Sequence, residues 1–130
     1  MLENGYAESG FSVQKSGRDI DVRIAKDGIC HWIVGIQLLV YGKNDAIVLR
    51  DAVTSEKIRL CVKNGGCTLS LADAELRVTQ NDLEALESIL LDYLTNRFFD
   101  GMHLDLECTE GRTGTCYNVS VGVEDGSRGE

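Results

Sequence analysis

In one long stretch, residues 79–101, hydrophobic and polar positions alternate with the period of an α-helix. There, in TQNDLEALESILLDYLTNRFFDG, apolar residues recur at steps of three and four, the spacing of one helix face. Thr79 is a natural N-cap, and Asp82 is a variant of the capping-box acid that also suits the helix dipole. Gly101 is the expected stop. The sequence therefore predicts an amphipathic helix over about residues 80–100.

Elsewhere, short alternating runs of apolar and polar residues are separated by turns that contain glycine, which predicts β-hairpins. A two-residue turn at 16–17 would pair Val13 with Ile20 on one face. After the helix, a four-residue loop would pair Cys108 with Tyr117. Both registers place apolar residues opposite apolar residues.

The stretch 58–71 contains a strong local turn signal. Asn64-Gly65 is typical of a type I′ hairpin turn and would pair Val62 with Cys67. The residues that follow, 72–78, have room for one more short strand before the helix. The sequence thus predicts a meander in which each strand pairs with the next.

The most apolar stretch is 29–41, ICHWIVGIQLLVY. As a strand it would be apolar on both faces, with the even positions 32–40 on one face and Ile33, Leu39 and Tyr41 on the other. A buried helix is the alternative, but the β-branched residues and flanking glycines favour the strand. One predicted helix cannot cover both faces, so these three side chains form a candidate interface of a homodimer. The alternative is a sheet that curls so far around the helix that both faces become internal.

These elements predict an α+β domain: a strongly curved antiparallel β-meander of about six strands, one amphipathic helix and a C-terminal β-hairpin. A single domain covers 1–130, with 1–9 and 124–130 expected to be flexible. Glu87 and Arg97 lie within the apolar arc of the helix. They either extend past its edge or line a cavity or an interface, and they are the candidate pocket residues.

Charge changes the functional picture because it is unevenly placed. The formal net charge is −8, and residues 80–130 hold eleven of the 21 acidic and three of the 13 basic side chains. A nucleic-acid binder needs the opposite sign, so nucleic acid is not an expected partner. An acidic face either keeps a protein soluble or attracts a basic protein. The candidate residues for such an acidic partner face are His103, Asp105, Glu107 and Glu110.

Candidate chemistry is sparse. Asp19, Asp21 and Arg23 form one polar stripe, and His103, Asp105 and Glu107 form another that could hold a cation or act as acid and base. A solvated sheet face is the ordinary explanation of both stripes. The spacings of the five cysteines do not match zinc sites, and no nucleophile or phosphate motif is present. No catalytic residue, metal or cofactor is therefore predicted.

The N-terminal residues lack the basic and apolar regions of a secretory signal, and no apolar run is long enough to span a membrane. The sequence thus predicts a cytoplasmic protein with reduced thiols and no membrane contact. The favoured function is a non-catalytic binding or interaction protein, homodimeric, with room for a small apolar ligand pocket. The alternatives are an acidic inhibitor or immunity-type protein that neutralises a basic partner, and a small enzyme that uses His103, Asp105 and Glu107.

Overall fold

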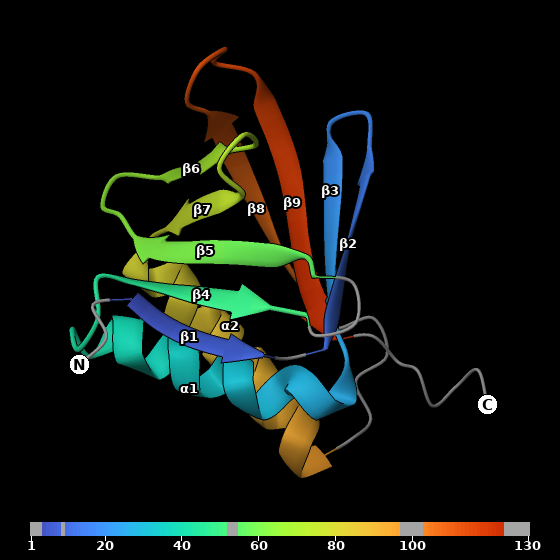
Figure 1. The fold of residues 1–130 in the computed structure, drawn as a ribbon, viewed down its shortest axis with the longest axis vertical. Helices are drawn as coiled ribbons and strands as arrows, with labels where there is room; N and C mark the ends of the chain where they lie inside the picture. Colours follow the sequence, from blue (N-terminus) through green and yellow to red (C-terminus); the bar gives the residue numbers. More distant parts are fainter. Residues whose placement is uncertain (1–3, 9, 52–54, 97–102, 124–130) are drawn as a thin grey trace.

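The computed structural model describes residues 4–8, 10–51, 55–96 and 103–123 and has an α+β fold (Figure 1). The strands are β1 Asn4–Glu8, β2 Phe11–Ser16, β3 Asp19–Ile24, β4 Ala46–Arg50, β5 Lys57–Val62, β6 Cys67–Ser70, β7 Glu75–Val78, β8 His103–Glu110 and β9 Cys116–Val123. The helices are α1 Ile29–Val40 and α2 Gln80–Asn96, and a 3-10 turn, η1 Lys26–Gly28, leads into α1.

The strands described form one mixed sheet in the order β1-β4-β5-β7-β6-β8-β9-β3-β2. Parallel and antiparallel contacts alternate along it, because antiparallel pairs such as β2–β3 and β8–β9 lie side by side through parallel contacts such as β3–β9. The expected α+β class and curved sheet are confirmed. The simple antiparallel meander is wrong, because half of the contacts between the described strands join strands that are not consecutive in the chain.

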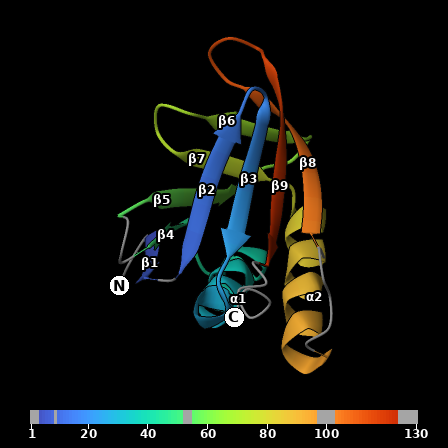
Figure 2. The ribbon, with the colours of Figure 1, turned by 90° about the vertical axis from the view of Figure 1, so that its right-hand side faces the viewer.

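The sheet curls into a half-barrel, and the position of its edges explains why. β1 and β2 are at opposite edges of the sheet, yet only residues 9 and 10 separate them in the chain. So short a connection requires the two edges to come close where β1 ends and β2 begins, as Figures 1 and 2 show. The edges diverge toward the β2–β3 turn, so the curled sheet is narrow at one end and open at the other.

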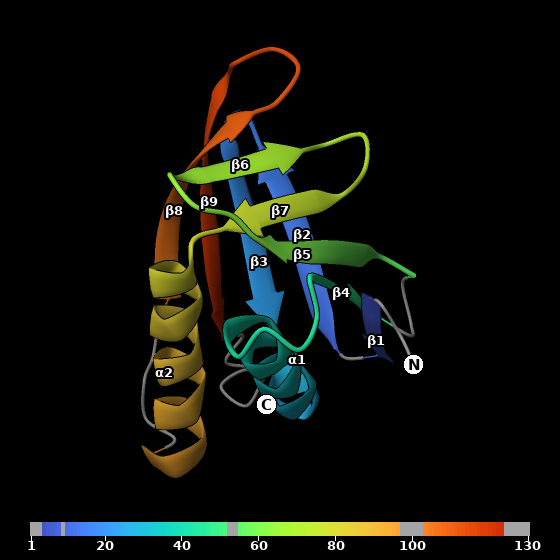
Figure 3. The ribbon, with the colours of Figure 1, turned by 90° about the vertical axis from the view of Figure 1, so that its left-hand side faces the viewer.

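The two helices lie at the narrow end of the half-barrel (Figures 1 and 3). Their apolar side chains join the inward side chains of the strands in one core. Among these, Trp32 of α1 is 1% exposed and meets Phe11 of β2 edge to face, with ring centroids 5.6 Å apart. The core therefore links α1 directly to an edge strand.

The strand predicted over 29–41 is wrong, because this segment forms helix α1. Its buried side chains recur at steps of three and four, from Ile29 through Trp32, Ile33 and Ile36 to Leu39. The same apolar run is compatible with a strand that is buried on both faces and with a helix that has one wide buried face. Contact with the inner face of the sheet favours the helix, and this packing outweighs the β propensity of its residues.

Gly35 lets α1 approach the sheet closely. A Cβ at this position would overlap with Ile47 Cδ1, and it would also touch Leu49. Both of these β4 side chains are buried, so neither can move aside freely. A glycine in mid-helix is therefore explained by packing.

The predicted amphipathic helix is confirmed as α2, although residues 97–102 lie outside the described part of the chain. The N-cap is also confirmed, since the backbone N–H of Asp82 donates to Thr79 Oγ1 at 3.1 Å. The Asp82 carboxylate in turn accepts a bond from Thr79 Oγ1 at 3.0 Å. Local sequence thus sets the start of this helix.

The hairpin registers are partly confirmed. Cys108 pairs with Tyr117 as predicted. In the first hairpin, Val13 pairs with Val22 instead of Ile20, because the turn residues are Gly17 and Arg18. Gly17 has a φ of 61°, which suits the first central position of a type II′ turn. A shift of two residues leaves every side chain on the predicted face.

The hairpin predicted at Asn64-Gly65 is wrong. β7 lies between β5 and β6, so Val62 pairs with Val78 and not with Cys67. A type I′ turn needs positive φ at both central residues. Here Gly65 and Gly66 have φ of 87° and 117°, and Asn64 does not have a positive φ. The connection from β5 to β6 therefore passes across β7, which lies between them. The short strand predicted within 72–78 is confirmed as β7.

Candidate functional site

The open end of the half-barrel contains an apolar pocket of about 330 Å³. Its wall comes from the inner faces of β2, β3 and β9 on one side and of β5, β6 and β7 on the other. The aliphatic lining residues are Val13, Ile20, Val22, Ile58, Leu69, Leu71, Ala74, Leu76 and Val119. The polar residues around it are Glu56, Lys57, Ser70 and Glu75. Cavities that bind small molecules have this size and this mostly apolar lining.

Two carboxylates bridge the gap between the sheet edge β2 and the segment that joins β4 to β5. The backbone N–H of Phe11 donates to Asp51 Oδ1 at 3.1 Å, and that of Val13 donates to Glu56 Oε1 at 3.2 Å. These edge N–H groups thus donate to side chains and not to another strand. We name this pair of contacts the carboxylate seam. Because Val13 and Glu56 also line the pocket, the seam forms part of its wall.

The outer face of β3, β9 and β8 combines the two polar stripes predicted from the sequence. Strand register places Asp21 and Asp105 on either side of Ser120. Asp19 and Glu107 likewise flank Asn118, two residues before Ser120 on the same face of β9. A shallow groove of about 390 Å³ runs over this face. The structure therefore assembles one mostly acidic surface from residues that are far apart in the sequence. It also contains Arg23, whose Nε lies 3.0 Å from Asp21 Oδ1.

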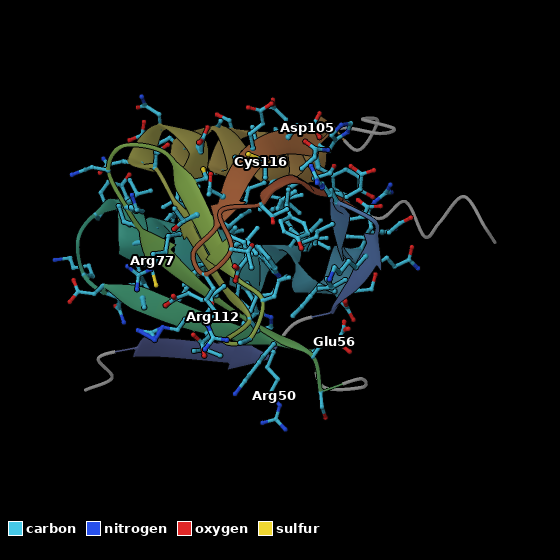
Figure 4. All side chains as sticks on the ribbon, turned by 90° about the horizontal axis from the view of Figure 1, so that it is seen from above. Arg50, Glu56, Arg77, Asp105, Arg112 and Cys116 are labelled. Atoms are coloured by element: carbon cyan, nitrogen blue, oxygen red, sulfur yellow. The ribbon has the colours of Figure 1, made fainter. Side chains whose placement is uncertain are left out.

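The predicted acidic partner face divides between the two sides of β8. His103, Asp105 and Glu107 are exposed on the outer side, as their alternation predicts, and His103 Nε2 lies 3.4 Å from Asp105 Oδ2. Glu110 has the opposite parity and is 5% exposed. Figure 4 shows Asp105 and Glu56 on different sides of the molecule, so this face is separate from the pocket.

Glu110 organises the loop between β8 and β9. Its Oε1 accepts bonds from the backbone N–H groups of Arg112 at 2.8 Å and Thr113 at 2.9 Å. The bond from the Thr113 N–H, followed by that from Arg112, lowers the pKa of the Glu110 carboxyl. This residue therefore has a structural role in the loop.

We expect Glu110→Gln to lower the melting temperature at neutral pH and to have less effect in acid. The folded-state pKa of Glu110 lies below the ordinary value of 4.5. Its contribution to stability is therefore present above that value and is lost as pH falls through the folded-state pKa. Thermal unfolding of both proteins across this range would measure the difference. Glu107→Gln, on the exposed face of the same strand, is the matched control, and an equal effect at every pH would contradict the prediction.

The candidate pocket and interface residues have different positions from those expected. Glu87 is half-buried between the helices, where its Oε2 accepts a bond from Gln37 Nε2 at 2.8 Å, and Arg97 lies outside the described residues. Ile33 and Leu39 are buried in the chain's own core, and Tyr41 is 69% exposed. The homodimer was inferred from a two-faced strand that does not exist. It stays a prediction, without that support.

The five cysteines are free thiols. Cys30 and Cys116 are exposed, Cys61 and Cys108 are buried, and Cys67 is half-buried. Cys61 Sγ donates to Glu75 Oε2 at 3.4 Å on the outer face. Burial, followed by this bond, raises the pKa of the Cys61 thiol.

Sequence reasoning identified the inward residues of the strands but not the pocket that they line. The pocket depends on β7 lying beside β5 and on β3 lying beside β9, two parallel contacts that no local turn signals. The seam residues Asp51 and Glu56 were also missed, because they belong to a polar connection with no periodic pattern. Alternation alone correctly placed His103, Asp105 and Glu107 together.

Within the described residues, no group of three or more His, Cys, Asp or Glu side chains is arranged to hold a metal ion. Neither described helix is long and apolar enough to cross a membrane.

The chain matches no protein-family model, and no curated protein is significantly similar to it in sequence. The geometry of the chain itself is therefore the basis for a functional proposal.

Proposed function

We propose that this protein is a non-catalytic binding protein that holds a small, mostly aliphatic ligand in the pocket of the half-barrel. The observation that carries the proposal is the cavity of about 330 Å³ with an aliphatic lining at the open end of the sheet. One water molecule takes up about 30 Å³ of the liquid. A methylene group has a similar size, so this space holds about ten non-hydrogen atoms. A medium-length aliphatic chain has this size.

The position of the pocket also supports this function. Leu71, at its mouth, is 40% exposed, whereas deeper lining residues such as Leu69 and Val119 are buried. A ligand chain would cover this exposed apolar surface and remove it from water. Each buried CH₂ group contributes about 0.8 kcal/mol before the entropic cost of binding. We therefore expect weak to moderate affinity, in the micromolar to millimolar range.

We expect 1-octanol to bind in this pocket and to shift the backbone amide NMR signals of its lining residues in a saturable way. Val13→Trp should abolish these shifts, because the half-buried Val13 lies in the pocket wall and a large ring there would fill the cavity. Gln14→Trp is the matched control, since the exposed Gln14 belongs to the same strand but to its outer face. Unchanged spectra, or equal loss of binding in both variants, would refute the proposal.

A second candidate function is docking of a basic protein on the acidic outer face. The observation that favours it is the register that gathers Asp19, Asp21, Asp105 and Glu107 around one column of β9. Such a surface would accelerate association with a cationic partner in a salt-dependent way. The enzyme alternative has less support, because His103 and Asp105 are 46% and 59% exposed on an open face. Exposure of this kind is typical of a solvated surface pair.

A further inference from the structure

The fold pairs two cysteines that are far apart in the sequence. Cys67 on β6 and Cys108 on β8 are direct partners in the parallel contact between these strands. Neighbouring strands lie about 4.8 Å apart, and disulfide-bonded cysteines have Cα atoms about 4.4–6.8 Å apart. Residues that are direct partners in neighbouring strands point to the same face of the sheet, so the two side chains lie side by side. Backbone spacing and side-chain direction thus both allow a bond between the sulfurs.

The surroundings of the two thiols differ. Cys67 is half-buried, and its Sγ donates to Asp82 Oδ2 at 3.4 Å beside the start of α2. Cys108 is 1% exposed. Burial raises the pKa of both thiols, that of Cys108 to about 12. Cys67 is therefore the thiol that a reagent can reach, and Cys108 is placed to react with whatever Cys67 carries.

We propose that Cys67 and Cys108 are a redox-active pair that forms a reversible disulfide by exchange with a low-molecular-weight disulfide such as glutathione disulfide. The Cys67 thiolate attacks one sulfur of the reagent, forms a mixed disulfide and expels one glutathione thiolate, which takes up a proton. The Cys108 thiolate then attacks the Cys67 sulfur and expels the second glutathione. Two protein thiols are oxidised, and one glutathione disulfide is reduced to two thiols.

The disulfide would tie β6 to β8 and close a loop that contains β7 and α2. A cross-link over so long a loop restricts the unfolded chain, so the oxidised protein should melt several degrees higher. The reaction should also be faster at higher pH, because both thiols must lose a proton before they attack. Thermal stability and pH dependence are thus two readouts of the same bond.

The test uses a variant with Cys30→Ser, Cys61→Ser and Cys116→Ser, which retains the pair, and treats it with glutathione disulfide at mildly alkaline pH. We expect the intact mass to fall by two hydrogens, peptide mapping to find Cys67 linked to Cys108, and dithiothreitol to reverse both. The wild-type protein is mapped in parallel, so the result does not depend on the folding of the variant. Glutathione adducts without a link, or no reaction in the folded protein, would overturn the proposal.

Two further variants in the same background test the order of events. Cys108→Ser should stop the reaction at the first step, so that glutathione accumulates on Cys67. Cys67→Ser should leave Cys108 unmodified in the folded protein, because that thiol is buried. Equal reactivity of Cys108 with and without Cys67 would show that the two cysteines act independently.

Discussion

Ile36→Ala is expected to lower the free energy of unfolding by about 2–5 kcal/mol, whereas Val34→Ala should change it by less than about 0.5 kcal/mol. Ile36 is fully buried on the inner side of α1, so its truncation leaves a cavity in the core. Val34 is two residues earlier on the same helix and is 55% exposed. Urea denaturation of the two variants beside the wild type measures both values.

This pair of variants distinguishes the helix from the strand that the sequence favoured. In a strand, Ile36 and Val34 would point to the same face and would be buried together, so both truncations would cost a similar amount. In α1 they are separated by about 200° around the helix axis. Similar losses for the two variants would therefore contradict the helical structure of residues 29–40.

Asp51→Ala is expected to destabilise the protein by about 1–3 kcal/mol, because it leaves the buried N–H of Phe11 without its acceptor. Asp51 is 6% exposed and Phe11 is 4% exposed, so water cannot easily replace the lost bond. Asp51→Asn is the matched control, since its amide oxygen can still accept this bond, and it should cost less. Chemical denaturation gives both differences, and an alanine variant as stable as the asparagine variant would show that the carboxylate seam contributes little.

The carboxylate seam also explains how the half-barrel exists without a closing strand. β2 is an edge strand, and two of its N–H groups would otherwise be available for pairing with another chain. Asp51 and Glu56 occupy those donors with side chains, which leaves the space beyond them open as the pocket. The same contacts therefore protect the edge and border the candidate binding site.

Much of the local structure could be predicted from the sequence, because it depends on neighbouring residues. Thr79 and Asp82 set the start of α2 through their own side chains. The alternation in 103–123 was enough to pair Cys108 with Tyr117, because one register alone aligns the apolar residues across a short loop. In the β2–β3 hairpin the alternation correctly predicted which side chains share a face, although the observed register differs from the predicted one by two residues.

The candidate site was predictable only where one strand carries it. The exposed side of β8, with His103, Asp105 and Glu107, follows from alternation along a single strand. These residues share a surface with Asp19 and Asp21 only because β9 lies between β3 and β8. No short-range signal in the sequence specifies that strand order. The lining of the pocket depends in the same way on parallel contacts between distant strands.

The sequence by itself determined the amphipathic helix, the parity of the strands and the excess of acid in residues 80–130, since these depend on local pattern and composition. Only the tertiary structure decided that residues 29–40 are helical, that β7 separates β5 from β6, and that Cys67 meets Cys108. An apolar run can be buried as a helix or as a strand, and a strand can pair with any free edge. Packing of the whole chain into one core selects among these solutions, because local energies differ too little to do so.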